Sequence, residues 1–175
     1  NVVTGCQLNN INESGTLIDP PRPVNPEIAV DKLTSCGPAI FNFFTAQVSG
    51  FTYSWKLDGI PQFPSTSFYN PNLSTVKKYV ISLSQTQNST NCVSDISTKE
   101  VEVFTAVNAT IAGKTEVCEG YDEVISAMAS TGSGEYTYKW STGETTAIKD
   151  LKTLADGLYA FKVTITDKNN CTNAT

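Results

Sequence analysis

Carboxylates and cysteines are the residues of this chain whose types and spacing could do chemistry. The 175 residues include no histidine, so neither a Ser-His-Asp triad nor a Cys-His pair can form, and no imidazole is available for zinc. The carboxylates close enough in sequence to act as acid–base pairs are Glu100–Glu102, Glu116–Glu119 and Asp122–Glu123. Glu100 and Glu102 alternate along an expected strand and are most simply its solvated face. We therefore expect no enzymatic activity and no catalytic residue.

Four of the five cysteines fall into two pairs of similar spacing. Cys36 and Cys92 are 56 positions apart, and Cys118 and Cys171 are 53 apart, with one tryptophan inside each pair. We expect an intradomain disulfide in each pair, which would stabilise a small domain by about 4 kcal/mol. Cys6 would be an unpaired cysteine or one whose partner lies in a preceding module. Matched spacing without a CxxC motif favours disulfides, and hence an extracellular protein, over a set of cytosolic thiols.

Calcium is the metal for which the chain offers ligands, because loop aspartates supply hard oxygen donors. The loop aspartates are Asp58, Asp95, Asp122, Asp150, Asp156 and Asp167, and we retain Asp122, Asp150 and Asp167 as calcium candidates. None of them lies in an Asp-x-Asp-x-Asp arrangement, and Asp-Gly is first of all a turn signal. We therefore expect no required metal or cofactor, with a structural Ca²⁺ as the alternative.

Asn-x-Ser/Thr triplets occur at Asn12, Asn72, Asn88, Asn108, Asn170 and Asn173. In a secreted eukaryotic or archaeal protein these asparagines would be glycan acceptors on loops. In a chain rich in Asn, Ser and Thr, composition alone produces many such triplets.

The regions around the two tryptophans follow one plan. Residues 51–55 (FTYSW) and 136–140 (YTYKW) are each followed by a turn, a long alternating strand and a cysteine; the long strands are expected at residues 78–86 and 158–167. Alternation at a period of two predicts a strand at residues 51–57, with Phe51, Tyr53, Trp55 and Leu57 on one face, and residues 124–129 are expected to form a further strand. No stretch holds a helical period with caps. Two copies of one plan predict an all-β fold of two tandem β-sandwiches. Ile148, Leu151 and Leu154 are expected to enter the second core.

The chain divides into three expected parts. Residues 1–26 hold the end of a preceding module, or a donor strand, and a linker stiffened by prolines. Residues 27–106 form the first sandwich and residues 107–175 the second. Only four residues follow Cys171, so the second sandwich lacks a counterpart of the strand expected near residues 97–104.

The missing strand has two explanations. The first is that the chain, which opens with Asn1 rather than Met, is a processed or excised piece of a longer array. The second is that another subunit supplies the strand, with residues 6–19 as the donor.

Trp55 and Trp140, each with a tyrosine two residues before it (Tyr53 and Tyr138), could be core residues or platforms for sugar stacking. Their alternation and their place between paired cysteines favour a core tryptophan packed near a disulfide. We therefore expect all four aromatic side chains in the cores.

Composition limits the partners. The net charge is −5 and no cluster of Lys or Arg occurs, so a phosphate backbone would be weakly repelled and no nucleic-acid partner is expected. No stretch approaches the ~18 apolar residues of a membrane helix, so no membrane insertion is expected.

Residues 138–171 carry a pattern that resembles a known repeat. The pattern reads Tyr-x-Trp-Ser-x-Gly-x-Thr-Thr, then Leu-x-x-Leu-x-x-Gly-x-Tyr-x-x-x-Val-Thr-x-Thr-Asp-x-x-x-Cys. It resembles the repeat of SprB-type gliding adhesins. Residues 53–55 and 79–83 are similar to PKD-type and immunoglobulin-like modules of the same surface proteins. The first domain departs from the repeat by lacking Ser-x-Gly-x-Thr-Thr and by a Pro-rich insertion.

The resemblance implies immunoglobulin-like (PKD-like) sandwiches in a long, secreted, surface-attached protein of gliding bacteria, where it serves adhesion or forms a stalk. The motif residues are packing and turn residues, so no catalytic position carries over. In bacteria the Asn-x-Ser/Thr triplets would usually carry no glycan.

We thus expect a non-catalytic extracellular segment at the cell surface, structural or adhesive. Its partners would be neighbouring repeat modules, or identical subunits joined by strand addition, with a surface polysaccharide or protein as the adhesive target. One alternative is a filament subunit that polymerises by donor-strand complementation. Another is a carbohydrate-binding module of a secreted enzyme, which predicts exposed coplanar aromatics on one sheet face; Tyr69 and Tyr121 are recognition candidates.

Overall fold

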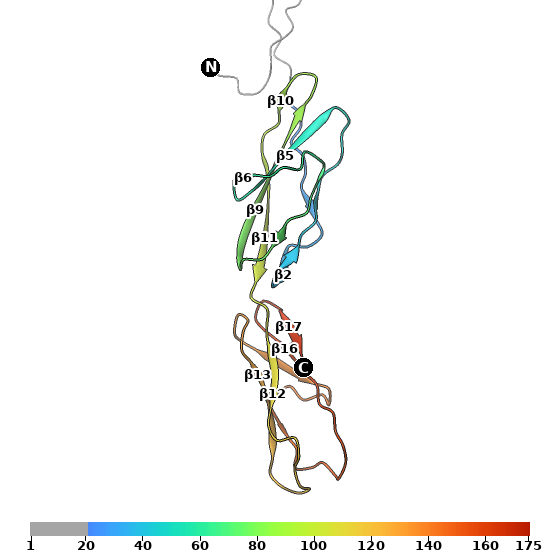
Figure 1. Ribbon diagram of the computed structural model, residues 1–175, viewed down its shortest axis with the longest axis vertical. Coiled ribbons are helices and arrows are strands. Elements are labelled where there is room, and N and C mark those ends of the chain that lie inside the picture. The colour runs from blue at the N-terminus through green and yellow to red at the C-terminus, as the bar shows by residue number, and fades with distance from the viewer. Residues whose placement is uncertain (1–20) are drawn as a thin grey trace, which may run out of the picture. The chain divides into compact units, whose positions relative to one another are not determined.

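The structure is a computed structural model that describes residues 21–175, and no helix occurs in that range. The chain divides into two compact units, the first ending at Glu102 and the second beginning at Val103. Strands build both units, as Figure 1 shows. None of the described residues belongs to a helix long and apolar enough to cross a membrane.

The first unit is a β-sandwich whose last strand continues two residues past the boundary. Its strands are β1 (Ala29–Val30), β2 (Thr34–Cys36), β3 (Ala39–Ile40), β4 (Phe43–Phe44), β5 (Phe51–Leu57), β6 (Ile60–Pro61), β7 (Phe68–Tyr69), β8 (Asn72–Leu73), β9 (Lys77–Gln87), β10 (Cys92–Val93) and β11 (Ser97–Phe104). One sheet has the order β2-β11-β9-β5-β6, with β10 also paired to β9. Facing it are the β1-β4-β7 sheet and the short β3-β8 pair.

The two long strands β5 and β9 build the first core by alternation. They pair antiparallel, with Tyr53 opposite Gln85 and Trp55 opposite Leu83. Since side chains alternate between the faces of a sheet, every second residue points inward. Trp55 and Leu83 are fully buried, together with Val103 of β11. The expected strand at residues 51–57 therefore forms with the expected inward face.

The turn from β5 to β6 is held by its aspartate. Asp58 and Gly59 have φ of 50° and 82°, as a two-residue hairpin of type I′ requires. The Asp58 carboxylate pairs with Lys77 Nζ at 2.6 Å and accepts the Val80 N–H at 2.8 Å. These two interactions, that with Lys77 first, lower the pKa of Asp58. Asp58 thus acts as a turn residue.

The second unit is a smaller sandwich of two three-stranded sheets. Its strands are β12 (Ala109–Ala112), β13 (Val124–Ala129), β14 (Thr137–Trp140), β15 (Ile148–Asp150), β16 (Val163–Thr166) and β17 (Thr172–Ala174), ordered β12-β13-β15 and β14-β16-β17. Trp140, Val163 and Ile165 pack with Ile125 and Ala127 between the sheets.

Register decides which side chains of β15 enter the second core. Ile125 of β13 lies opposite Lys149, so Lys149 points inward and Ile148 is exposed. The expectation that Ile148 would be a core residue is wrong, because a three-residue strand follows the pleat set by its neighbour. Leu151 is buried and Leu154 is partly buried, as expected.

The proline-containing segment before β1 is attached to the first unit. The buried Gln85 side chain donates from Nε2 to the Val24 carbonyl at 2.7 Å. Arg22 forms a salt bridge with Asp95 at 2.9 Å, and Pro26 is buried. Residues 22–26 therefore pack against the first unit, which was expected to start at Glu27.

Candidate functional site

Each unit holds its tryptophan by the same hydrogen bonds. In the first, Trp55 Nε1 donates to the Thr66 carbonyl at 2.9 Å, and Thr66 Oγ1 donates to the carbonyl two residues further on at 3.0 Å. In the second, Trp140 Nε1 donates to the Thr146 carbonyl at 2.9 Å, and Thr146 Oγ1 donates to the carbonyl two residues further on. Both indoles are buried, so no sugar can stack on them.

The tyrosines that precede the tryptophans lie at different depths. Tyr53 is buried, and its hydroxyl donates to the Ala46 carbonyl at 3.0 Å and accepts the Val48 N–H at 2.8 Å. Tyr138 is only partly buried and packs against the second core. Both side chains contribute to packing, Tyr53 more completely.

The Ser-x-Gly-x-Thr-Thr motif forms a turn beside the second core. The Trp140 N–H donates to the Glu144 carbonyl at 2.9 Å, and the Gly143 N–H donates back to the Trp140 carbonyl at 3.0 Å. Gly143 has a φ of 104°, which favours glycine. Ser141 bonds the backbone of Lys162 in both directions, through its N–H and its Oγ. The motif is therefore a backbone scaffold.

The one buried lysine of the described residues is neutralised by this turn. Lys149 pairs with Glu144, and its ammonium lies 5.1 Å from the centroid of the Phe161 ring. Hydrogen bonds from Lys149, and then from Thr142, lower the pKa of Glu144 to about 2. The Glu144 carboxylate of the motif is thus paired with a lysine of the same unit.

Asp167 organises the turn between β16 and β17. It is buried, and its carboxylate accepts the N–H groups of Ser133 at 2.8 Å, Asn169 at 2.9 Å and Cys171 at 2.9 Å. Burial by itself raises the pKa of Asp167, but these donors outweigh it and hold the pKa below its usual value. Its oxygens are engaged by the backbone.

The other calcium candidates lie on the surface of the second unit. Asp122 pairs with Lys152 at 2.6 Å, and Asp150 accepts the Lys152 N–H at 2.8 Å. Within residues 21–175, no three acidic or cysteine side chains gather into a metal-binding group. Sequence reasoning did not foresee that Asp167 would be buried, because one of its donors, the Ser133 N–H, lies 34 residues earlier in the chain.

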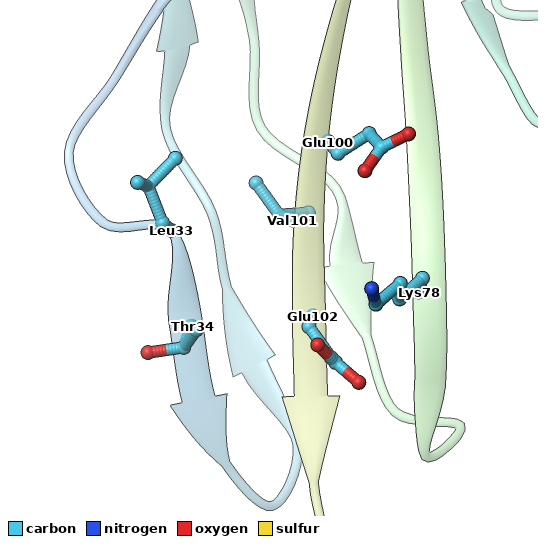
Figure 2. Close-up of a pocket in the computed structure, with 6 residues that line it drawn as sticks. All are labelled: Leu33, Thr34, Lys78, Glu100, Val101 and Glu102. Carbon is cyan, nitrogen blue, oxygen red and sulfur yellow. The ribbon is translucent and has the colours of Figure 1, made fainter. Parts of the chain in front are cut away.

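The carboxylate pairs considered for acid–base chemistry do not share an enclosed site. Glu100 and Glu102 line a shallow surface depression of about 180 Å³ with Lys78. Figure 2 shows both carboxylates on the side of β11 toward β9, with Val101 on the other side. The remaining pairs lie on the loop between β12 and β13, where Glu116 and Glu119 are exposed.

The disulfide pairing differs from expectation. Cys36, Cys92 and Cys171 are disulfide-bonded, whereas Cys118 is a free, exposed thiol. The expected Cys118–Cys171 bond is therefore wrong.

A direct Cys36–Cys92 bond does not fit the sheet either. Cys92 pairs with Gln87 at one end of β9, whereas Thr34 of β2 and Lys78 line one depression near the other end. Nine strand residues span about 30 Å, and a disulfide needs Cα atoms within about 7 Å. Cys6 lies outside the described residues.

The Asn-x-Ser/Thr asparagines are mostly accessible. Asn72, Asn88, Asn108 and Asn170 are exposed. Asn173 is partly buried, and its Nδ2 donates to the Val107 carbonyl at 2.9 Å. Asn12 lies outside the described residues.

Two aromatic side chains point outward side by side on the first unit. Phe44 of β4 lies opposite Phe68 of β7, and both are exposed. Tyr121 is exposed as well, but Tyr69 is buried, and burial raises its pKa. Tyr69 is therefore a core residue and not a recognition candidate. The sequence did not reveal the outward pair. Residues 41–45 hold three phenylalanines, of which Phe41 and Phe43 are buried and only Phe44 is exposed.

A surface groove opens in the second unit. It is a groove of about 590 Å³ between the loop that follows β12 and the segment that precedes β16. Its lining combines the apolar side chains of Ile111, Ile125, Leu151, Leu154, Tyr159 and Phe161 with the polar side chains of Lys114, Thr115 and Glu116. The expected strand at residues 158–167 is shorter than predicted, because β16 begins only at Val163. The groove runs beside the part that did not form a strand.

Comparison with known proteins supports the fold. No protein-family model matches the chain, and a search of curated proteins finds no relative. Among solved structures, the chain is similar to the C-terminal 282-residue fragment of intimin, solved in complex with the intimin-binding domain of the translocated intimin receptor (Tir). The TM-score is 0.52 at 16% identity.

The similarity covers 85% of this chain but only 61% of the intimin fragment. At that identity the likeness shows the fold alone. The chain therefore consists of immunoglobulin-like β-sandwich units.

Proposed function

We propose that the chain is a non-catalytic, extracellular segment of a long cell-surface repeat protein, where it serves as a stalk and adhesive module. The observation that carries this proposal is the duplicated sandwich. In the second unit, residues of the pattern that resembles SprB-type adhesins contribute to packing, turns and hydrogen bonds within the fold.

Two further observations support a location outside the cell. Three cysteines of the described residues are disulfide-bonded, and disulfides persist mainly in oxidising compartments. The fold is that of an intimin fragment whose structure contains a bound receptor domain. The corresponding partner of this chain would be a surface polysaccharide or protein.

The test is the location of the native protein and the effect of its loss. Antibodies raised against the folded chain should label intact source cells, and protease added to those cells should remove the label. A deletion strain should adhere less to surfaces or glide less. Label that appears only after lysis, with unchanged adhesion, would contradict the proposal.

A carbohydrate-binding module is a second candidate, and one observation favours it. Phe44 and Phe68 form an outward aromatic pair on one sheet face, and aromatic faces bind sugar rings. In a glycan array, the chain should then bind a polysaccharide, and the Phe44→Ser, Phe68→Ser double variant should lose that binding. Tyr121→Ser, which changes an exposed aromatic in the other unit, is the matched control. No glycan bound by the unaltered chain would exclude this candidate.

A further inference from the structure

A surface pocket of the first unit lies between the outer face of its larger sheet and the segment that joins β10 to β11. Its volume is about 540 Å³, and the charged side chains that line it are Arg22, Lys56 and Asp95. We infer that this pocket binds an acidic sugar unit of a polysaccharide, with the acid group, a carboxylate or a sulfate, held between Lys56 and Arg22. The inference rests on the proposed adhesive function and names the class of its target.

The register of two strands places the sheet side of the pocket. Tyr53 and Trp55 of β5 are buried, so Ser54 and Lys56 point to the outer face of the sheet. Ser54 lies opposite Ser84 of β9, and Ser84 lines the pocket together with Lys56. Both strands lie inside the sheet order β2-β11-β9-β5-β6. A ligand would therefore meet side chains of a sheet interior here and not a strand edge.

Lys56 is a cation that the fold leaves available. It is half-buried, and within residues 21–175 its ammonium has no salt bridge, hydrogen bond or cation–π partner. The carboxylate in the lining, that of Asp95, accepts one hydrogen bond from Nη1 of Arg22 at 2.9 Å. A guanidinium has five N–H donors, so Arg22 keeps donors for a second acid group. The lining thus carries two cations and one anion, in a chain whose net charge is −5.

The wall opposite the sheet is fixed by Ser94. Ser94 is buried, and its hydroxyl accepts the Gln85 N–H at 3.0 Å and donates to the Asp95 carbonyl at 2.8 Å. Its own N–H donates to the Gln85 carbonyl at 2.9 Å. These bonds hold Asp95 beside β9, and Asp95 in turn positions Arg22. The second cation is therefore in place before a ligand binds, which lowers the cost of binding.

The other groups at the pocket favour a sugar over an acidic peptide or a nucleic acid. The sheet face that carries Lys56 also carries hydroxyls in register, Ser54 opposite Ser84 and Thr52 opposite Thr86. A hydroxyl both donates and accepts hydrogen bonds, as sugar hydroxyls do. Ile96 lines the pocket and is exposed, so it offers an apolar surface to the C–H face of a sugar ring. A peptide that adds to a sheet needs a free edge, and a phosphate backbone is gripped by several cations.

Binding of the purified full chain to polymers of defined charge tests the inference. The immobilised polymers are polygalacturonate, dextran sulfate, neutral dextran and polyglutamate. We expect the chain to bind polygalacturonate or dextran sulfate, to lose that binding as salt is raised, and to bind dextran and polyglutamate clearly more weakly. The tighter of the two charged polysaccharides identifies the acid group. Binding to neither of them, or equally tight binding to polyglutamate, would overturn the inference.

Substitutions locate the binding site. Lys56→Gln should weaken binding by about tenfold or more, because it removes a charge-assisted hydrogen bond to the acid group. Lys56→Arg should keep most of the binding, and Arg22→Gln should weaken it. The matched control is Lys139→Gln, which removes the same charge from an exposed position of β14 and should leave binding unchanged. Equal losses in Lys56→Gln and Lys139→Gln would contradict the site, since only the net charge would then matter. Thermal unfolding checks that each variant keeps its fold.

Two further results separate this site from the other proposals. The Phe44→Ser, Phe68→Ser double variant should bind the acidic polysaccharide as the unaltered chain does; a loss there would assign the binding to the aromatic pair instead. Binding by the purified chain is also independent of the labelling of intact cells. Binding without surface labelling would keep the site and reject the proposed location, and labelling without binding would do the reverse.

Discussion

At the scale of single residues, the motif that resembles an adhesin repeat is explained by hydrogen bonds. Asp167 accepts the Cys171 N–H, Thr146 donates its hydroxyl to the Ile148 carbonyl, and Gly143 donates its N–H to the Trp140 carbonyl. Their spacing could be recognised in the sequence, because each bond is local. The inward Lys149 could not be predicted, because it depends on the register of β15 against β13.

Asp167→Asn should lower the stability of the chain at pH 7. The variant removes a buried carboxylate that accepts three N–H groups, and hydrogen bonds to charged groups contribute about 1.5–3 kcal/mol each. Because the pKa of Asp167 is lowered from 3.8, its contribution is full above that pH and is lost as pH falls through the lower, folded-state pKa. Urea unfolding should therefore show a gap between the two proteins at pH 7 that narrows below pH 3.8; a constant gap would contradict this role.

Lys149→Met should change stability little, by less than about 1 kcal/mol in either direction, because methionine fills the same space without a buried charge. Glu144→Ala should be clearly more destabilising, since it leaves the Lys149 ammonium buried without its carboxylate. Thermal unfolding of the two variants gives the comparison. The reverse order would show that Lys149 reaches solvent.

Cys118 should be the cysteine of residues 21–175 that reacts with iodoacetamide in the folded, non-reduced chain, because it is a free and exposed thiol. Cys118→Ser should shift stability by less than about 0.5 kcal/mol, as expected for a surface change. Peptide mapping after labelling checks the first point. A label on Cys36, Cys92 or Cys171 before reduction would contradict it.

At the scale of elements, alternation predicted the strands at residues 51–57 and 124–129 with the bounds that the structure has. For residues 158–167, alternation predicted a longer strand than the one observed, because β16 spans only Val163–Thr166. The two long strands are alike in sequence, but β9 has neighbours along its length whereas residues 158–161 have none within the described chain. Strand length therefore depends on a pairing partner that local pattern does not contain.

The two tyrosine hydroxyls give a matched prediction at this scale. Tyr79→Phe should destabilise the first unit by about 1 kcal/mol, because a buried hydroxyl loses its carbonyl partner. Tyr159→Phe should cost less, because its ring is half-exposed and water can satisfy the carbonyl of Ala155. Urea unfolding of both variants measures the difference, and equal losses would argue that Tyr159 is already covered.

At the scale of the whole molecule, the chain consists of two immunoglobulin-like units, and the mechanical and adhesive role is our proposal. The repeat itself could be recognised in the sequence from the spacing of tryptophans, tyrosines and cysteines. The disulfide partners could not, because equal spacing within each repeat suggested a Cys118–Cys171 bond, whereas Cys118 is a free thiol.

Intact-mass and terminal-peptide analysis of the native, non-reduced protein, recovered from the surface of source cells, tests the central claim most directly. The proposal predicts a much longer polypeptide, with further modules before Asn1 and after Thr175. A polypeptide that ends near both residues and runs as a ladder of non-covalent multimers would contradict the stalk and establish a filament subunit instead.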